Sequence, residues 1–251
     1  MIIGGGWSGI GVAGCLSHNN FDDYTLLEQT ECFGGFWKNH TYNSVRMHDL
    51  SRLYNTPLHI ATKYENRFLS RLEVPTYLAE YANHYDITSH SKFNFKVTKI
   101  SYLENEDESY RWIIVGNSND SEHSFRCRYL CIATSYCRIP LIPEALKNSI
   151  PNYRGLIMHS DAYKSPSDFD ITKHKRILII GGGHSSAEIS TELSDAGFQV
   201  DIAHRGGQYF MKQDDWSEYL SNQNLDKSLQ YLKSSMADPD FKGKSQSKLK
   251  I

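Results

Sequence analysis

A continuous apolar segment at residues 176–180 precedes a run of glycines and then a polar segment with apolar positions at helical spacing. Such a segment is typical of a parallel strand covered on both faces. Gly197 is expected to end the helix, and residues 198–203 are expected to form the next strand. The apolar stripe of the helix consists of Ala187, Ile189, Leu193 and Ala196. Strand, glycine turn, helix and strand together predict a Rossmann-like unit.

The same order of elements recurs at the start of the sequence. Residues 1–3 are apolar and lead into glycines, residues 8–18 have the composition of a helix, and residues 24–27 predict a second strand. The helix contains Gly11, Ala13 and Gly14, whose small size allows close packing. The first strand is short against the usual five or six residues.

The residues between the two units follow another pattern. A helix is predicted from Pro75, and segments 93–102, 110–115 and 124–133 predict the three strands of an antiparallel meander. A proline-containing stretch then indicates a crossing between domains. The fold class is therefore α/β, with two Rossmann-like dinucleotide-binding domains and a small antiparallel β meander. We expect a first domain at residues 1–138, a linker at 139–172, and a second domain at 173–251 with a polar tail from about residue 211.

Composition narrows the function classes. The sequence has 251 residues, 39% of them hydrophobic, so it is long enough to form a core. A net charge of −2 gives no electrostatic footprint for nucleic acid. The five cysteines, Cys137 among them, include no CxxC pair, which favours a reducing compartment and argues against a flavin disulfide reductase. No long apolar run and no signal peptide are visible, so the expected location is cytoplasmic.

The two glycine turns carry the candidate chemistry. The first turn reads Gly4-Gly5-Gly6-Trp7-Ser8-Gly9, and the second reads Gly181-Gly182-Gly183-His184-Ser185-Ser186. A pyrophosphate must approach bare backbone N–H groups at a helix N-terminus, where the helix dipole favours negative charge. Side chains in the turn would block that approach. Both turns therefore predict dinucleotide binding.

Each turn is followed 24 residues later by a charged residue, and the two charges have opposite sign, Glu28 and Arg205. A carboxylate after the second strand accepts hydrogen bonds from ribose hydroxyls, whereas an arginine suits a 2′-phosphate. Glu28 therefore favours FAD or NAD at the first turn, and Arg205 favours NADP at the second. The alternative is that both are solvated residues that follow strands.

Beyond these turns, the chain resembles the flavin-containing monooxygenases. Residues 153–163 are similar to the family signature FxGxxxHxxx(Y/F/K), with Tyr153 in place of Phe and with Gly155, His159 and Tyr163 in their places. Gly34-Gly35-Phe36-Trp37 is similar to the GGxW segment, and Ala133-Thr134-Ser135 resembles an Ala-Thr-Gly motif. The region around His48 looks most like the plant-type branch.

The resemblance implies roles for individual residues. FAD would be held by Gly4, Gly6, Gly9, Glu28, Gly35 and Trp37, and NADP by Gly181, Gly183, Ser186 and Arg205. His159 would couple the domains, and the alternative is a packing histidine. His48 falls where many relatives carry an asparagine near the reactive flavin position, and the alternative is an ordinary loop histidine. No metal is implied.

The reaction that the resemblance implies begins with hydride transfer from NADPH to FAD. Reduced flavin captures O2, and the resulting flavin C4a-hydroperoxide oxygenates a small-molecule nitrogen or sulfur nucleophile or a related substrate. Three alternatives stay open: an NADPH oxidase that releases H2O2, a Baeyer-Villiger enzyme, which usually has Trp at the position of Tyr163, and an inactive nucleotide-binding fragment. Family members usually continue beyond the point at which this sequence stops, so we expect it to be truncated and to hold flavin poorly.

Overall fold

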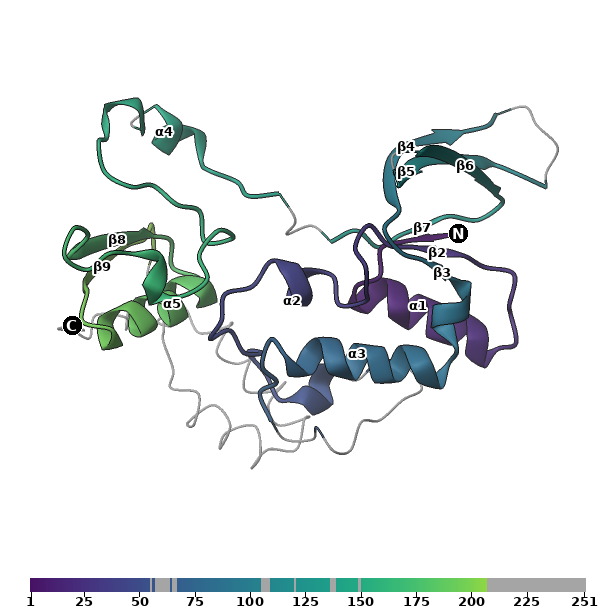
Figure 1. The fold of residues 1–251 in the computed structure, drawn as a ribbon, viewed down its shortest axis with the longest axis horizontal. Helices are drawn as coiled ribbons and strands as arrows, with labels where there is room; N and C mark the ends of the chain where they lie inside the picture. The colour runs from purple at the N-terminus through teal and green to yellow at the C-terminus, as the bar shows by residue number, and fades with distance from the viewer. Residues whose placement is uncertain are drawn as a thin grey trace, which may run out of the picture. The chain divides into compact units, whose positions relative to one another are not determined.

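The computed structural model describes residues 1–54, 56, 64, 67–104, 109–119, 121–135, 139–148 and 150–206 (Figure 1). The described residues form two compact units. Unit 1 takes those within Met1–Tyr42, Tyr54–Lys63 and Leu69–Tyr163, and unit 2 takes those within Asn43–Leu53, Tyr64–Phe68 and Lys164–Ile251. The polar segment from residue 211 and Cys137 lie outside the described residues, and the domain limits at 138 and 172 stay a prediction.

Unit 1 contains a parallel sheet in the order β3-β2-β1-β7. Its strands are two residues long each: β1 (Ile2–Ile3), β2 (Leu26–Leu27), β3 (Ser91–Lys92) and β7 (Cys131–Ile132). Helix α1 (Trp7–His18) follows β1, which confirms the predicted strand, turn and helix. All four residues of β1 and β2 are buried, which explains why strands this short persist.

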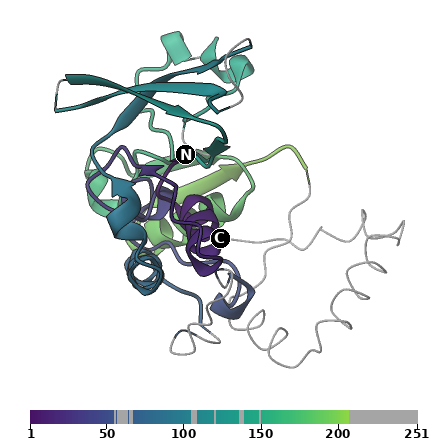
Figure 2. The ribbon, with the colours of Figure 1, turned by 90° about the vertical axis from the view of Figure 1, so that its right-hand side faces the viewer.

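The antiparallel meander is confirmed, with strands β4 (Lys96–Tyr102), β5 (Trp112–Ser118) and β6 (Ser121–Cys127). Figure 2 shows these strands side by side at the top of the view. The meander packs on the parallel sheet through Phe95 and Ile114, which cluster with Ile3 and Leu27. The parallel sheet and the meander therefore share one core.

One predicted strand was wrong. Residues 124–133 were expected to form a single strand of the meander, but the chain leaves it after Cys127 and enters the parallel sheet as β7. The reason is a set of hydrogen bonds with β1: Cys131 N–H donates to Met1 O at 2.9 Å, and Ala133 N–H donates to Ile3 O at 2.8 Å. These bonds bring residues 133–135 to the carboxyl end of β1.

Helix α3 (Glu73–His84) begins two residues before the predicted Pro75 and packs against α1. Gly14 lies directly beneath the Tyr81 phenol, so the expectation that small residues in α1 allow close packing is confirmed. Burial of Tyr81 raises the pKa of its hydroxyl well above the usual value.

Unit 2 contains two parallel strands, β8 (Arg176–Ile180) and β9 (Gln199–Ala203), connected by α5 (His184–Asp195), as predicted. The expectation that β8 is covered on both faces was wrong for the described residues. Ile189 and Leu193 of α5 are buried, but Leu178 and Ile180 of β8 are 60% and 58% exposed. Helix α5 packs on both strands but leaves these two side chains exposed.

Short helical segments connect these elements. Within the described ranges, two are short α-helices, α2 (Phe36–Asn39) and α4 (Glu144–Lys147), and four are 3-10 helices: η1 (Ser51–Tyr54), η3 (Ile87–His90), η4 (Ile150–Asn152) and η5 (Pro166–Asp168). Every helix in the described part of the chain is too short or too polar to cross a bilayer. The four described cysteines, Cys15, Cys32, Cys127 and Cys131, are free thiols.

Candidate functional site

Unit 1 has a cavity of about 640 Å³ at the carboxyl ends of β1 and β2. Five residues that the sequence assigned to FAD line it: Gly4, Gly6, Glu28, Gly35 and Trp37. The carboxyl edge of a parallel sheet is where ligands bind in open α/β folds. The wall also includes Trp7, Ser8, Gln29, Phe36, His40, Thr134 and Ser135.

The first glycine turn offers bare backbone to this cavity. Gly4 has φ of +109°, which disfavours residues with a Cβ. A Cβ built on Gly35 would lie 2.9 Å from the Cα of Gly6, so these two backbones approach closely. Gly6 itself has φ of −83°, and a Cβ there would meet only the Gly35 Cα, at 3.7 Å. The open side of Gly6 therefore faces the cavity.

The N-terminus of α1 points at the same space. Gly6 is the N-cap, and within the described residues no side chain caps the helix and no acidic residue occupies its first turn. The first N–H groups are therefore available to an anion, which the helix dipole also favours. Gly9 is not among the residues that line the cavity. A Cβ at this position would clash with the Gly4 carbonyl oxygen. Its role is to let the helix lie against the turn.

Glu28 is 4% exposed and is held by three hydrogen bonds. Oε2 accepts from the Gly5 N–H at 2.6 Å, and Oε1 accepts from the Thr30 N–H at 2.9 Å and the Thr30 hydroxyl at 2.8 Å. A carboxylate offers about four acceptor positions. Oε2 therefore keeps capacity for a hydroxyl of a ligand in the cavity, and the side chain is fixed in advance.

The second glycine turn, in unit 2, repeats this geometry. The Gly181 N–H donates to Ala203 O at 2.9 Å, as the Gly4 N–H donates to Leu27 O at 2.8 Å. Gly183 caps α5 with φ and ψ of −85° and −177°, against −83° and −173° at Gly6. A Cβ on Gly183 would meet no described atom within 4 Å. Both turns are therefore shaped alike.

Two other residues assigned to the second dinucleotide lie near this turn. Ser186 is buried, and its hydroxyl donates to the Gly183 carbonyl at 2.7 Å. Arg205 is exposed beyond the end of β9. The carbonyl of Ala203 accepts the hydrogen bond from the second turn, as the carbonyl of Leu27 does from the first. The residue that corresponds to Glu28 is therefore His204, and Arg205 lies one residue further along the chain.

His48 belongs to unit 2, where it stacks on His184 with ring centroids 3.8 Å apart and planes at 10°. His184 is the first residue of α5, so the pair lies at the second turn. The His48 Nε2 is 3.7 Å from the Glu188 Oε1. Burial first, and the neighbouring His184 second, lower the pKa of His48 below its ordinary value. The sequence did not indicate that these two histidines meet.

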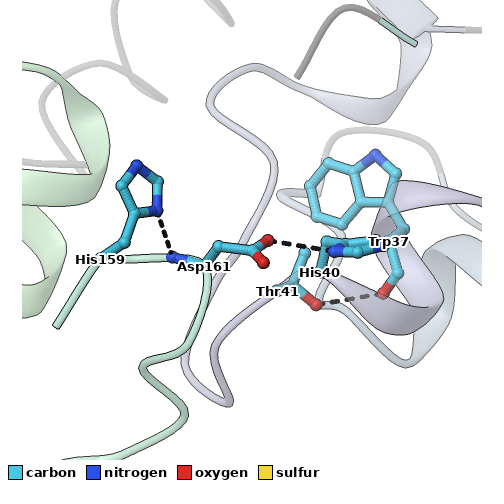
Figure 3. A network of polar contacts seen from close by, with 5 residues as sticks. All are labelled: Trp37, His40, Thr41, His159 and Asp161. Carbon is cyan, nitrogen blue, oxygen red and sulfur yellow. Dashed lines mark hydrogen bonds and ion pairs between the residues drawn. The ribbon is translucent and has the colours of Figure 1, made fainter. Parts of the chain in front are cut away.

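His159 is joined to the cavity wall through two residues that the sequence analysis missed (Figure 3). The Asp161 N–H donates to the His159 Nδ1 at 3.1 Å, and the Asp161 Oδ1 lies 3.1 Å from the His40 Nδ1. His40 lines the cavity, and His159 does not. No local pattern marks this network, because His40 and Asp161 are 121 residues apart.

The family described as flavin-binding monooxygenase-like matches residues 1–239. The chain belongs to this family. The family and the parallel strands at each glycine turn together confirm the α/β fold class that the sequence predicted.

Among curated relatives, the chain is 27% identical over 195 residues to the probable indole-3-pyruvate monooxygenase YUCCA9 of Arabidopsis thaliana, covering 78% of this chain and 44% of that protein. It is 26% identical over 231 residues to the human dimethylaniline monooxygenase [N-oxide-forming] 4, covering 86% and 40%. The chain thus spans less than half the length of these relatives. The crystal structure of OTEMO in complex with FAD and NADP has the same fold, with a TM-score of 0.64, 24% identity, and coverage of 93% of this chain and 44% of that one.

Proposed function

We propose that this chain carries the FAD and NADP sites of a flavin-dependent monooxygenase that uses NADPH and O2 to oxygenate a small-molecule nitrogen or sulfur nucleophile. The observation that carries the proposal is the unit 1 cavity, where bare backbone, a helix N-terminus and a buried carboxylate converge. Its volume of about 640 Å³ is within the range typical of ligand pockets.

The residues of unit 1 fit the parts of FAD. Gly6 and the first N–H groups of α1 would hold the pyrophosphate, since a phosphate can approach there without meeting a side chain. Glu28 would accept a ribose hydroxyl through Oε2. Gly35 and Trp37 would form the wall beside the cofactor and exclude water from it. Bound flavin supplies the redox chemistry and the activation of O2.

The second turn is the proposed NADP site. Gly181 and Gly183 leave the backbone open to a pyrophosphate, and the Ser186 hydroxyl stabilises the turn by its bond to Gly183. Arg205 would pair with the 2′-phosphate as a charge-assisted contact. His48 and His184 lie at the same turn, which favours a role for His48 at the nicotinamide dinucleotide. A catalytic role for His48 stays a prediction.

The class of substrate is proposed from the relatives. The human relative is named for forming N-oxides, which supports a nitrogen nucleophile. The plant relative is named for acting on indole-3-pyruvate, a 2-oxo acid, which is the related substrate class. An oxidase that releases H2O2 is the competing outcome of the same chemistry, because access of water to the flavin would favour it. A cytoplasmic location and a role of His159 in coupling the domains also stay predictions.

The test is to purify the chain, add FAD, and follow NADPH consumption in air together with H2O2 release and oxidation of dimethylaniline. We expect FAD-dependent consumption of NADPH that exceeds that of NADH. An oxygenated product supports monooxygenation, whereas quantitative H2O2 without product supports the oxidase. Failure of the chain to bind FAD at all would contradict the proposal.

A further inference from the structure

The contact between His40 and Asp161 joins two distant segments of unit 1. His40 follows α2 directly and lines the proposed flavin cavity, three residues after Trp37. Asp161 lies within the signature segment 153–163, two residues after His159. Figure 3 shows Asp161 between the two histidines, with its backbone toward His159 and its carboxylate toward His40. The Asp161 side chain thus connects the signature segment to His40 on the cavity wall.

The geometry fixes which nitrogen of His40 carries hydrogen. An ionised carboxylate only accepts hydrogen bonds, so the Nδ1 of His40 must donate to the Asp161 Oδ1 across 3.1 Å. A neutral imidazole with hydrogen on Nδ1 has its lone pair on Nε2. Within the described residues, the Nε2 of His40 has no hydrogen-bond partner. In its neutral form, this cavity-lining residue therefore offers a hydrogen-bond acceptor at Nε2.

His159 must have the opposite tautomer. Its Nδ1 accepts the hydrogen bond from the Asp161 N–H at 3.1 Å, so a neutral ring carries its hydrogen on Nε2. The network thus predicts hydrogen on the Nδ1 of His40 and on the Nε2 of His159 when both rings are neutral. His159 is an internal reference for any measurement on His40.

The backbone beneath His40 is also held. The His40 N–H donates to Phe36 O at 2.9 Å, and the Thr41 hydroxyl donates to Trp37 O at 3.1 Å. Both bonds close the end of α2, so His40 is fixed relative to Trp37. With the backbone and Nδ1 both held, the ring has little freedom to turn.

We infer that Asp161 is a positioning residue that fixes His40 as a hydrogen-bond acceptor toward an N–H or O–H group of bound FAD. This inference rests on the proposed function, because FAD is the proposed occupant of the cavity. The signature segment would then determine the hydrogen-bonding character of the cavity wall, in addition to its predicted role in coupling the domains.

The first experiment is long-range 15N–1H NMR of the imidazoles in the full chain without FAD, at mildly alkaline pH. We expect a pyrrole-type Nδ1 for His40 and a pyrrole-type Nε2 for His159. In Asp161→Asn the side-chain amide can donate as well as accept, so the His40 tautomers should mix. The backbone N–H of residue 161 is kept in this variant, so His159 should not change. A pyrrole-type Nε2 at His40 in the unaltered chain would overturn the inference.

The second experiment is titration with FAD, followed by quenching of flavin fluorescence and by the visible spectrum of the bound flavin. His40→Phe keeps a ring and removes the acceptor, so FAD should bind about threefold to tenfold more weakly. Asp161→Asn should give a smaller loss of affinity. The control is Glu144→Gln, which breaks an exposed ion pair with Lys147 in unit 1 and should leave FAD binding unchanged.

The outcomes separate this inference from the proposed function. If Gly6→Ala weakens FAD and His40→Phe does not, the proposed function stands and the inference fails. If the unaltered chain binds no FAD, the proposed function fails, and with it the assignment of His40 to FAD. Opposite tautomers in the NMR spectra, together with a loss of affinity in His40→Phe, support the inference.

Discussion

Substitution of Gly6 by alanine separates cofactor binding from folding. In the structure, the added Cβ would meet only the Gly35 Cα at 3.7 Å, which is an ordinary contact. The φ of −83° is allowed for alanine. Alanine is a poorer N-cap than glycine but also reduces the freedom of the unfolded chain, and these effects oppose each other at about 1 kcal/mol or less. Gly6→Ala should therefore leave the free energy of unfolding nearly unchanged.

The effect on FAD should be large. The methyl group would occupy the space from which a pyrophosphate approaches the N-terminus of α1, so at least one hydrogen bond to a charged oxygen is lost. Such a bond contributes about 1.5–3 kcal/mol, which corresponds to roughly 10-fold to 150-fold weaker binding. The assay is titration of the apoprotein with FAD by flavin fluorescence, with thermal unfolding measured on the same samples.

Two further variants are the controls. Gly183→Ala makes the same change at the second turn, where the added Cβ would meet no described atom within 4 Å, and should leave FAD binding unaltered. Gly9→Ala would clash with the Gly4 carbonyl oxygen and should lower the melting temperature. A folded Gly6→Ala that binds FAD within twofold of the unaltered chain would refute the assignment of the first turn.

Three other predictions concern the second turn and the core. Arg205→Ala should weaken NADPH about tenfold or more and NADH much less, measured as separate dissociation constants, and equal losses would contradict a contact with the 2′-phosphate. Because the pKa of His48 is lowered in the folded state, its contribution to stability is present above about pH 6.5 and is lost as the pH falls through the folded pKa. The free energy of unfolding, measured with urea, should therefore fall more from pH 8 to pH 5 in the unaltered chain than in His48→Gln. Equal falls in the two proteins would contradict a lowered pKa of His48. Gly14→Ala forces a methyl group into the Tyr81 phenol and should cost about 1–3 kcal/mol of unfolding free energy by urea titration, whereas an unchanged midpoint would contradict the close packing.

The sequence predicts what is determined locally. Both glycine turns follow from short-range requirements: Gly4 and Gly181 have φ of +109° and +139°, which glycine adopts readily. Glu28 was found by its distance from the turn, and the structure places it in the cavity. These features depend on a strand, a turn and a helix that are adjacent in the sequence.

The features that the sequence missed depend on distant partners. Strand β7 could not be told from a continuation of β6, because alternation does not show that residues 131–132 pair with β1. The exposure of Leu178 and Ile180 depends on which elements cover β8, and an apolar run does not report that. The contact of His40 with Asp161 requires the folded chain, since His40 lies in no motif and Asp161 stands at a position that the signature leaves unspecified.

Equilibrium titration of the purified chain with FAD and, separately, with FMN tests most directly whether the first turn holds a flavin dinucleotide. FMN lacks the second phosphate and the adenosine that Gly6, α1 and Glu28 are proposed to bind. We predict one FAD bound per chain and FMN at least about tenfold weaker, as expected for the loss of a single charged hydrogen bond. Equal affinity for the two flavins, or no saturable binding of FAD, would contradict this assignment.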